Sequence, residues 1–384
     1  MNEYPKNNQI VIGRRSNRTK LISLTIILTN LTQMPQLISS GYNSIITMVS
    51  WSILLIVALL HTRKLSKDIF YSLFLLIIVL IYSFLLQLIT HRNYMDISEL
   101  YPFALSVFVF CTGILCASII PDGRSFATLH RCYLLSGIVV AASVYLQIRS
   151  GYFNWLSRSY AYASKNSVSQ ILLTAVILCV FLNDRYKIAR WIIGGMIIYL
   201  LMMLRSRASL IGLVILSFYI FRDRDIKRGY KVLLAIGIIV AIVILLLNRN
   251  MYNIIVNGVI LGGRNKNNLE DLSSGRYSML LLFLHIFPDY ALTGYGSYYL
   301  ESFPLSILFQ YGIVGTIPFF FFLLLPFRRL KSIKYPEAKQ IILVLTMCYY
   351  ANGLFEELSP LGPGVKCYYL WFLLGCTSKR QLVE

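Results

Sequence analysis

Three arginines are the residues of this sequence best suited by type and surroundings to bind an anion. Arg205 and Arg207 stand in the short segment MLRSRAS between two apolar stretches, and Arg276 follows SSG at the start of another. A guanidinium offers planar, forked donors that match phosphate oxygens, and backbone N–H groups at a helix start add to that attraction near Arg276. Arginines at the edge of a bilayer are costly unless an anion compensates them. We therefore predict that these three arginines bind a diphosphate.

Two glutamates near the same segments are candidates for acid–base chemistry. Glu301 and Glu356 each stand where a polar segment meets an apolar one, so partial desolvation would suit either to act as a general base. Glu301 is our catalytic candidate and Glu356 a secondary one. Glu270 and Asp271 lie in a polar stretch and are expected to be solvated. An alternative stays open in which the arginines reach lipid head groups or pair with Glu270, Asp271 or Glu301.

The remaining polar and aromatic residues predict no metal site and no cofactor. The four histidines lack ligand spacing, and the sequence has no HExxH or GxxxxGK[ST] motif. His285 and Tyr298 are secondary site candidates, although both are also typical of a membrane interface. A belt of aromatic residues at the outer interface, some of which can stack on sugar faces, is predicted from Tyr152, Trp155, Tyr160, Tyr295, Tyr298 and Tyr299.

These residues are set in a very apolar chain. Of 384 residues, 57% are hydrophobic and only 14% are charged, and the mean hydropathy is +0.66. One soluble core cannot enclose so many apolar side chains. The net charge of +20 is typical, in such a chain, of loops that orient helices across a membrane. The composition predicts an integral membrane protein and argues against a DNA-binding protein or a soluble metabolic enzyme.

Twelve apolar runs are long enough, or nearly so, to cross a bilayer as helices. A spanning helix needs about 20 apolar residues, and about 17 are tolerated. We therefore predict an all-α, polytopic membrane protein with one transmembrane domain over residues 1–384. The predicted spans are 21–39, 44–60, 69–89, 101–120, 132–148, 167–182, 191–204, 208–221, 232–247, 303–327, 341–355 and 365–376.

Basic residues predict the direction of these spans. With the N-terminus in the cytoplasm, 25 of the 36 basic residues fall on the cytoplasmic side while acidic residues divide equally, which is the positive-inside bias with both termini cytoplasmic. The polar N-terminal stretch predicts a retained segment, not a signal peptide. The one long periplasmic loop is then 248–302, between the ninth and tenth spans. Its glycine-rich part, 262–276, predicts a mobile loop, and the apolar segment 277–287 predicts a helix on the membrane surface.

Several motifs in the second half of the chain resemble one membrane family. They are RSRAS at 205–209, SSGR at 273–276, TGYGS at 293–297, FQYGIVGTIPF at 309–319, NGLFE at 352–356 and WFLLG at 371–375. Over residues 200–376 this order is similar to that of the bacterial O-antigen polymerase and O-antigen ligase superfamily. Its members are inner-membrane glycosyltransferases of lipopolysaccharide biosynthesis that use undecaprenyl-diphosphate-linked glycans on the periplasmic side.

The resemblance implies roles for particular residues and partners. An arginine of the short hairpin, Arg205 or Arg207, and one of the long loop, Arg276, would engage the donor diphosphate. The implied partners are undecaprenyl-diphosphate-linked oligosaccharides, membrane lipids and a chain-length regulator protein, with no nucleic acid. The implied reaction is attack by a hydroxyl of an incoming repeat unit on the anomeric carbon of the growing chain. Diphosphate is a good leaving group, so orientation and charge stabilisation are expected to suffice without a metal.

The segment before FQYGIVG favours the polymerase branch of that superfamily. The ligase branch characteristically carries a histidine there, whereas this chain has ESFPLSIL at 301–308. We infer from position alone that Glu301 takes the acid–base role. Two other activities stay open: an O-antigen ligase that transfers glycan to lipid A-core, and a polysaccharide flippase or other transporter. A flippase would more naturally distribute charges along a central cavity in both halves. An assembly protein without activity is a further alternative.

Overall fold

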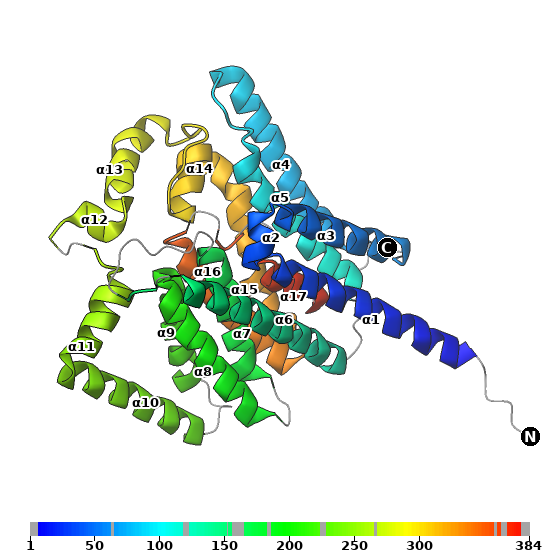
Figure 1. Cartoon of the computed structure of the whole chain (residues 1–384). Helices are drawn as coiled ribbons and strands as arrows, with labels where there is room; N and C mark the ends of the chain where they lie inside the picture. Colours follow the sequence, from blue (N-terminus) through cyan, green and yellow to red (C-terminus); the bar gives the residue numbers. More distant parts are fainter. Residues whose placement is uncertain are drawn as a thin grey trace, which may run out of the picture.

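The computed structural model describes residues 7–62, 65–117, 123–151, 153–155, 165–182, 186–222, 228–264, 267–356, 359–361 and 367–377. All elements of regular secondary structure within these ranges are helices (Figure 1). Those of the first half are α1 (Asn7–Leu31), α2 (Pro35–Ser39), α3 (Asn43–Leu60), α4 (Lys67–Thr90), α5 (Ile97–Cys116), α6 (Gly123–Ser150), α7 (Lys165–Phe181), α8 (Lys187–Leu204) and α9 (Arg207–Arg222).

The second half contains both long helices and short helical turns. They are α10 (Arg228–Leu247), α11 (Arg249–Tyr252), the π-helix η1 (Asn253–Ile260), α12 (Leu269–Ser273), α13 (Arg276–Ile286), the 3₁₀ turn η2 (Phe287–Tyr290), α14 (Phe303–Leu323), α15 (Leu325–Arg329), the 3₁₀ turn η3 (Leu330–Ser332), α16 (Pro336–Gly353) and α17 (Tyr368–Thr377).

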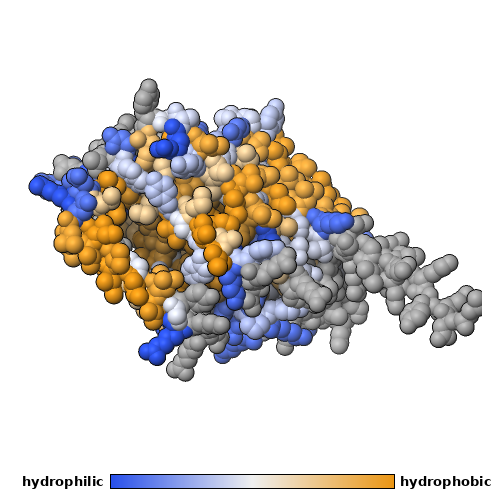
Figure 2. All heavy atoms as spheres, turned by 60° about the horizontal axis from the view of Figure 1, so that its bottom comes forward, coloured by the Kyte–Doolittle hydropathy of each residue, from blue (hydrophilic) through white to orange (hydrophobic). Residues whose placement is uncertain are grey.

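Each of the twelve predicted spans overlaps a helix, and several of these helices have membrane-spanning dimensions. Among the described residues, five helical stretches are long and apolar enough to cross a membrane, or six if one bent pair is a single span. Large apolar side chains face outward on many helices; Leu246 and Leu247 of α10, for example, are 78% and 82% exposed. Figure 2 shows wide hydrophobic areas on one face. Soluble proteins do not expose so much apolar surface, so the described helices are those of a membrane protein.

The first predicted span differs from the structure because its helix is interrupted. Helix α1 ends at Leu31, and a separate short helix, α2, begins at Pro35. Proline lacks a backbone N–H and restricts the residue before it to extended conformations. Met34 is accordingly extended, with φ −65° and ψ 140°. The run 21–39 is therefore broken at 32–34.

Helix α17 lies at the centre of the bundle (red in Figure 1) and every residue from Tyr368 to Thr377 is buried. It crosses α5 at two glycines. A Cβ on Gly113 would lie 2.4 Å from the carbonyl oxygen of Phe372, and one on Gly375 would lie 2.3 Å from that of Phe110. Small residues allow two membrane helices to approach this closely. The last predicted span is therefore the core of the bundle, although it is only ten residues long.

The TGYGS and FQYGIVG segments interlock backbone to backbone. Helix α14 is kinked at Gly312, which has φ 64° and ψ −174°. The chain 291–296 runs alongside this kink: the Tyr295 N–H donates to the Phe309 carbonyl (2.7 Å), and the Ile313 N–H donates to the Ala291 carbonyl (2.8 Å). A Cβ on Gly294 would lie 2.2 Å from the Gln310 carbonyl oxygen. Glycine is required there both for space and for its φ of +82°.

Residues of the α4–α5 connection hold the same segment from its other side. The Tyr94 hydroxyl donates to the Gly294 carbonyl at 2.7 Å. Arg92 donates to the Tyr290 hydroxyl at 2.9 Å and to the Tyr295 carbonyl at 3.3 Å, and its guanidinium lies over both rings. The chain 291–296 is thereby anchored to the α4–α5 connection and to α14, shortly before Glu301.

The predicted long loop 248–302 contains more helix than expected. The chain bends by 105° between α10 and the α11–η1 stretch. The segment 277–287, predicted to be a helix on the membrane surface, is helical as α13, with Leu280, Leu281 and Leu284 exposed by 41% to 57%. The glycine-rich part, expected to be an irregular loop, includes α12. The Asn268 side chain caps α12 by accepting from the N–H groups of Glu270 (2.9 Å) and Asp271 (3.3 Å).

Candidate functional site

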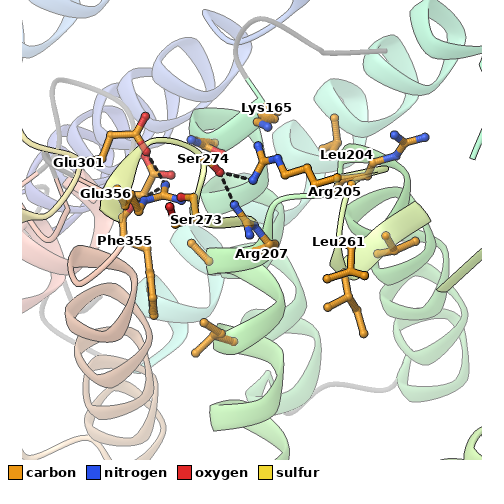
Figure 3. A pocket seen from close by; sticks show the side chains of 18 of the residues that line it. Lys165, Leu204, Arg205, Arg207, Leu261, Ser273, Ser274, Glu301, Phe355 and Glu356 are labelled. Carbon is orange, nitrogen blue, oxygen red and sulfur yellow. Dashed lines mark hydrogen bonds and ion pairs between the residues drawn. The ribbon is translucent and has the colours of Figure 1, made fainter. Parts of the chain in front are cut away.

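A cavity of about 670 Å³ lies where the α8–α9 turn meets the segment 259–280. We call it the cationic cavity; Figure 3 shows many of its side chains. Its polar lining consists of Lys165, Asn166, Arg205, Arg207, Arg264, Ser273, Ser274, Arg276, Glu301 and Glu356. Its apolar lining consists of Leu204, Ala208, Ile211, Val259, Ile260, Leu261, Tyr277, Leu280 and Phe355. Five cationic side chains thus face two carboxylates around one space.

Three helices begin at the cationic cavity, and each begins with one of its cations. Lys165 is the first residue of α7, Arg207 of α9 and Arg276 of α13. The first N–H groups of a helix lack partners within the helix, so this end carries a partial positive charge. The starts of α9 and α13 therefore add to the charge of their own side chains. Such an arrangement favours an anion with several oxygens, such as a phosphate group.

The turn between α8 and α9 is made by Arg205, which adopts a left-handed conformation with φ 52°. Its side chain is 8% exposed. It donates to the Asn154 carbonyl at 2.5 Å and lies 5.8 Å from the centre of the Phe153 ring. Although Arg205 lines the cavity, its guanidinium binds the 153–154 segment through these contacts. Arg205 therefore also has a structural role, which its spacing from Arg207 did not reveal.

Ser274 brings two arginines together. Its hydroxyl accepts hydrogen bonds from Nη2 of Arg207 and Nη1 of Arg264, and Arg207 also donates from Nη1 to the Leu272 carbonyl at 3.0 Å. Ser274 has φ 65° and the following Gly275 has φ 85°, so the chain reverses between α12 and α13. The dashed lines at Ser274 in Figure 3 mark the two contacts. The SSGR motif thus orients Arg207 from a distant part of the chain.

Arg276 connects the start of α13 to two other parts of the cavity wall. Its Nη2 lies 2.7 Å from Oε2 of Glu301, and the two side chains are 27% and 29% exposed. The same guanidinium donates to the carbonyls of Phe355 (2.9 Å) and Ser273 (3.3 Å). Within the described residues its buried Nε has no hydrogen-bond partner. A bound anion can therefore meet a guanidinium that is oriented in advance.

The cations of the cavity disfavour one another's charge. Burial lowers the pKa of Arg207 to about 10, and the nearby Arg264 and Arg276 contribute to this lowering while Glu301 opposes it. Burial likewise lowers the pKa of Lys165, with Arg264 and Arg207 as the next causes. Both groups lie before the predicted spans of their helices. An anion entering the cavity would relieve this repulsion, so the empty site favours anion binding.

The structure brings most of the predicted site residues together. Arg205, Arg207, Arg276, Glu301 and Glu356 all line the cationic cavity. The two acidic residues predicted to be solvated, Glu270 and Asp271, lie in α12, outside the cavity lining.

Two secondary candidates are separate from this cavity. His285 is exposed and lies on the same helix as Arg276, but about 13 Å further along its axis. Tyr298 is 41% exposed and packs against Phe309, with ring centres 5.5 Å apart. The prediction that they belong to the same site as the arginines is not supported by this geometry.

The predicted aromatic belt is only partly described. Trp155 is half-buried against Phe153, Tyr295 packs between Tyr290 and Phe309, and Tyr299 is 56% exposed. Tyr152 and Tyr160 lie outside the described residues.

Two cavity residues were not predicted. Lys165 and Arg264 line the cavity, but neither was a site candidate in the sequence, although Arg264 lies within the glycine-rich part 262–276. Both are basic residues on the predicted outer side, where basic residues are disfavoured. That same signal drew attention to Arg205 and Arg207 and would have identified Lys165 and Arg264 had it been applied to every outer cation.

Comparisons with known proteins do not place this chain in a family. No protein-family model matches the chain, and no curated protein is significantly similar to it. The chemistry of the site is therefore argued from its residues. A cavity with five cations, three helix starts, an apolar wall and two carboxylates can hold an anionic group attached to an apolar chain and can accept a proton beside it.

Proposed function

We propose that this protein is a glycosyltransferase that joins lipid-linked oligosaccharides, specifically an O-antigen polymerase. Its substrates would be undecaprenyl-diphosphate-linked repeat units on the periplasmic face of a bacterial inner membrane. The observation that carries the proposal is the convergence of Lys165, Arg207 and Arg276, each at a helix start, on one cavity. A diphosphate diester carries two negative charges, which this arrangement suits.

The apolar wall of the cavity supports a lipid-linked substrate over a soluble one. Leu204, Ile211, Val259, Ile260 and Leu280 lie on α8, α9, η1 and α13, next to the cations. A free nucleotide sugar would gain little from these side chains, whereas the first isoprene units of a polyprenyl diphosphate would bury apolar surface against them. Phosphate and lipid would thus be recognised by neighbouring parts of one cavity.

The proposed reaction moves the growing glycan from its lipid diphosphate onto an incoming repeat unit. A hydroxyl oxygen of the incoming sugar bonds to the anomeric carbon of the growing chain, and the bond from that carbon to the diphosphate oxygen breaks. The diphosphate leaves with the electron pair, and the arginines stabilise its additional charge. Glu301 is the proposed acceptor of the hydroxyl proton. The reaction needs no oxidant and no further substrate.

The proposed topology places the cavity at the periplasmic surface. Twelve spans with both termini in the cytoplasm are supported by the distribution of basic residues and by the overlap of every apolar run with a helix. Asn267→Cys should react with an impermeant maleimide added to cells whose outer membrane has been opened. Lys331→Cys should react only after the inner membrane is opened. Six of the seven native cysteines are buried, which keeps the background low. The reverse labelling pattern would refute this topology.

Deletion of the gene followed by electrophoresis of the surface glycan tests the activity. Loss of a polymerase leaves single repeat units attached to the lipid A-core, whereas loss of a ligase or flippase leaves none. Complementation with the wild-type gene should restore long chains, and Arg207→Ala at equal expression should not. Unchanged long chains in the deletion strain, or complete loss of attached glycan, would each reject the polymerase assignment.

A further inference from the structure

Lys165 differs from the arginines of the cationic cavity in having no hydrogen-bond or ion-pair partner among the described residues. Arg207 and Arg264 donate to Ser274, Arg276 binds Glu301, and Arg205 donates to a backbone carbonyl. The ammonium of Lys165 makes no hydrogen bond or ion pair with any residue that the structure describes. It lines the same cavity from the start of α7 (Figure 3). A half-buried cation without a protein partner is a candidate ligand for the bound anion.

The position of Lys165 suits direct contact with that anion. Lys165 and Asn166 both line the cavity, so the first turn of α7 faces it. The guanidinium groups that meet at Ser274 are already oriented by protein acceptors. A lysine ammonium is a compact charge on a flexible chain and can adapt to phosphate oxygens that the rigid guanidiniums leave uncovered.

We propose that the ammonium of Lys165 binds the diphosphate directly and that diphosphate binding draws a proton from solvent onto this amine. The proposal rests on the proposed function in that it takes a lipid diphosphate as the ligand. Where the amine is neutral before binding, the coupled step adds one proton from solvent and forms one ammonium–phosphate contact; no covalent bond changes. Lys165 would thus be a specificity residue for the charge of the ligand.

The surrounding charges give the sign of this coupling. In the empty cavity burial lowers the pKa of Lys165, and Arg264, Arg207 and Arg276 lower it further, while Glu356 opposes them. These groups come from the 262–264 segment, α9, α13 and the segment that follows α16. A bound dianion has the opposite effect, so the pKa rises on binding. The affinity is therefore greatest at pH values where the Lys165 amine is protonated both in the empty cavity and in the bound one. It falls as pH rises through the pKa that Lys165 has in the empty cavity.

The test uses a ligand whose own charge does not change with pH. P1-methyl-P2-farnesyl diphosphate is a diester with a constant double negative charge and a short prenyl chain. Its binding to the full chain in nanodiscs is measured by calorimetry at about pH 7 and about pH 9.5, in buffers of different ionisation enthalpy. The buffer dependence of the heat gives the number of protons taken up. The variants are Lys165→Met and Lys165→Arg, and the control is Lys187→Met, an exposed lysine at the start of α8.

The expected results separate binding from proton uptake. Lys165→Met should weaken binding at about pH 7 by roughly tenfold and reduce proton uptake. Lys165→Arg should retain affinity but take up fewer protons, because a guanidinium keeps its proton to a higher pH than an amine in the same place. Arg207, whose pKa is lowered to about 10, is one source of any pH dependence that remains. Lys187→Met should match the wild type in both quantities.

Each contrary result has a distinct meaning. If the wild type binds the diester and both Lys165 variants equal it in affinity and proton uptake, the Lys165 proposal is overturned and the polymerase proposal stands. If the wild type does not bind the diester, both proposals fail. If the elution profile of Lys165→Met shows that this variant is misfolded, the decision rests on Lys165→Arg. Proton uptake by Lys165→Arg that equals that of the wild type overturns the coupling. Binding without chain extension by the wild type would reject only the polymerase.

Discussion

The guanidinium of Arg276 and the carboxylate of Glu301 form an ion pair, with Nη2 and Oε2 2.7 Å apart. A diphosphate that binds Arg276 must therefore compete with Glu301. The pairing suggests an order of events in which the donor diphosphate displaces the carboxylate, which then becomes available to the acceptor hydroxyl. The two residues come from α13 and from the segment before α14, so this exchange links the outer loop to the kinked helix.

Glu301→Gln tests whether the carboxylate acts as a base. The substitution keeps the shape of the side chain and removes its charge, so chain extension should fall by about 100- to 10,000-fold, the usual contribution of a general base. Donor binding should be retained because Arg276 loses a competitor. The rate is measured with purified enzyme and lipid-linked repeats. Glu356→Gln, which changes the other carboxylate of the cavity, is the comparison. If Glu301→Gln is as fast as the parent and Glu356→Gln is slow, the roles are exchanged.

Arg207→Ala and Arg276→Ala should each weaken donor binding and chain extension. Each removes charge-assisted hydrogen bonds to the diphosphate worth about 1.5 to 3 kcal/mol. Lysine at either position should rescue poorly because it lacks the forked donors. Arg205→Ala should additionally lower the temperature of unfolding, since the Arg205 side chain is buried and holds the Asn154 carbonyl. Full-length glycan from the triple alanine variant at normal expression would refute the role of these arginines.

Ser274→Gly tests whether the orientation of two arginines by one hydroxyl matters for binding. Glycine is the appropriate replacement because Ser274 has φ 65°, where alanine would be strained. Without the hydroxyl, Arg207 and Arg264 lose a shared acceptor and repel each other more freely. The affinity for the diphosphate diester should fall by roughly tenfold while the unfolding temperature changes little. Ser278→Gly, at an exposed serine of α13, is a control outside the cavity. Equal affinity in wild type and Ser274→Gly would count against this orienting role.

Gly294→Ala tests the interlocked backbones beneath Glu301. The added Cβ would lie 2.2 Å from the Gln310 carbonyl oxygen at a residue with φ +82°. We expect a loss of about 1 to 3 kcal/mol in stability from this overlap, visible as a lower unfolding temperature in detergent, together with loss of chain extension. Gly195→Ala, in α8 with open space around it, should be neutral or slightly stabilising. Wild-type stability of Gly294→Ala would show that the two segments separate easily.

The helices of this protein and most of its candidate site residues were predictable from the sequence. Apolar runs predict helices because each side chain's preference for lipid, and each backbone group's need for a local hydrogen bond, are properties of a short stretch of chain. The arginines at 205, 207 and 276 were predictable for a similar reason, since a basic residue on the outer side of a membrane protein is costly wherever it occurs. Pro35 also carried a local signal for the break in the first span, which hydropathy alone concealed.

Tertiary packing alone decided which of these residues share a cavity. Lys165, Arg207 and Arg276 are far apart in sequence, and their convergence depends on how α7, α9 and α13 are placed by helices such as α16 and the kinked α14. The partners of each cation are equally non-local: the Ser274 hydroxyl holds Arg207, and Glu301 holds Arg276. Hydropathy and charge describe single positions, whereas the distance between two side chains depends on the packing of all the helices between them. For that reason the arginines at 205, 207 and 276 could be predicted as site residues from the sequence. Only the folded chain showed that Lys165 and Arg264 lie among them.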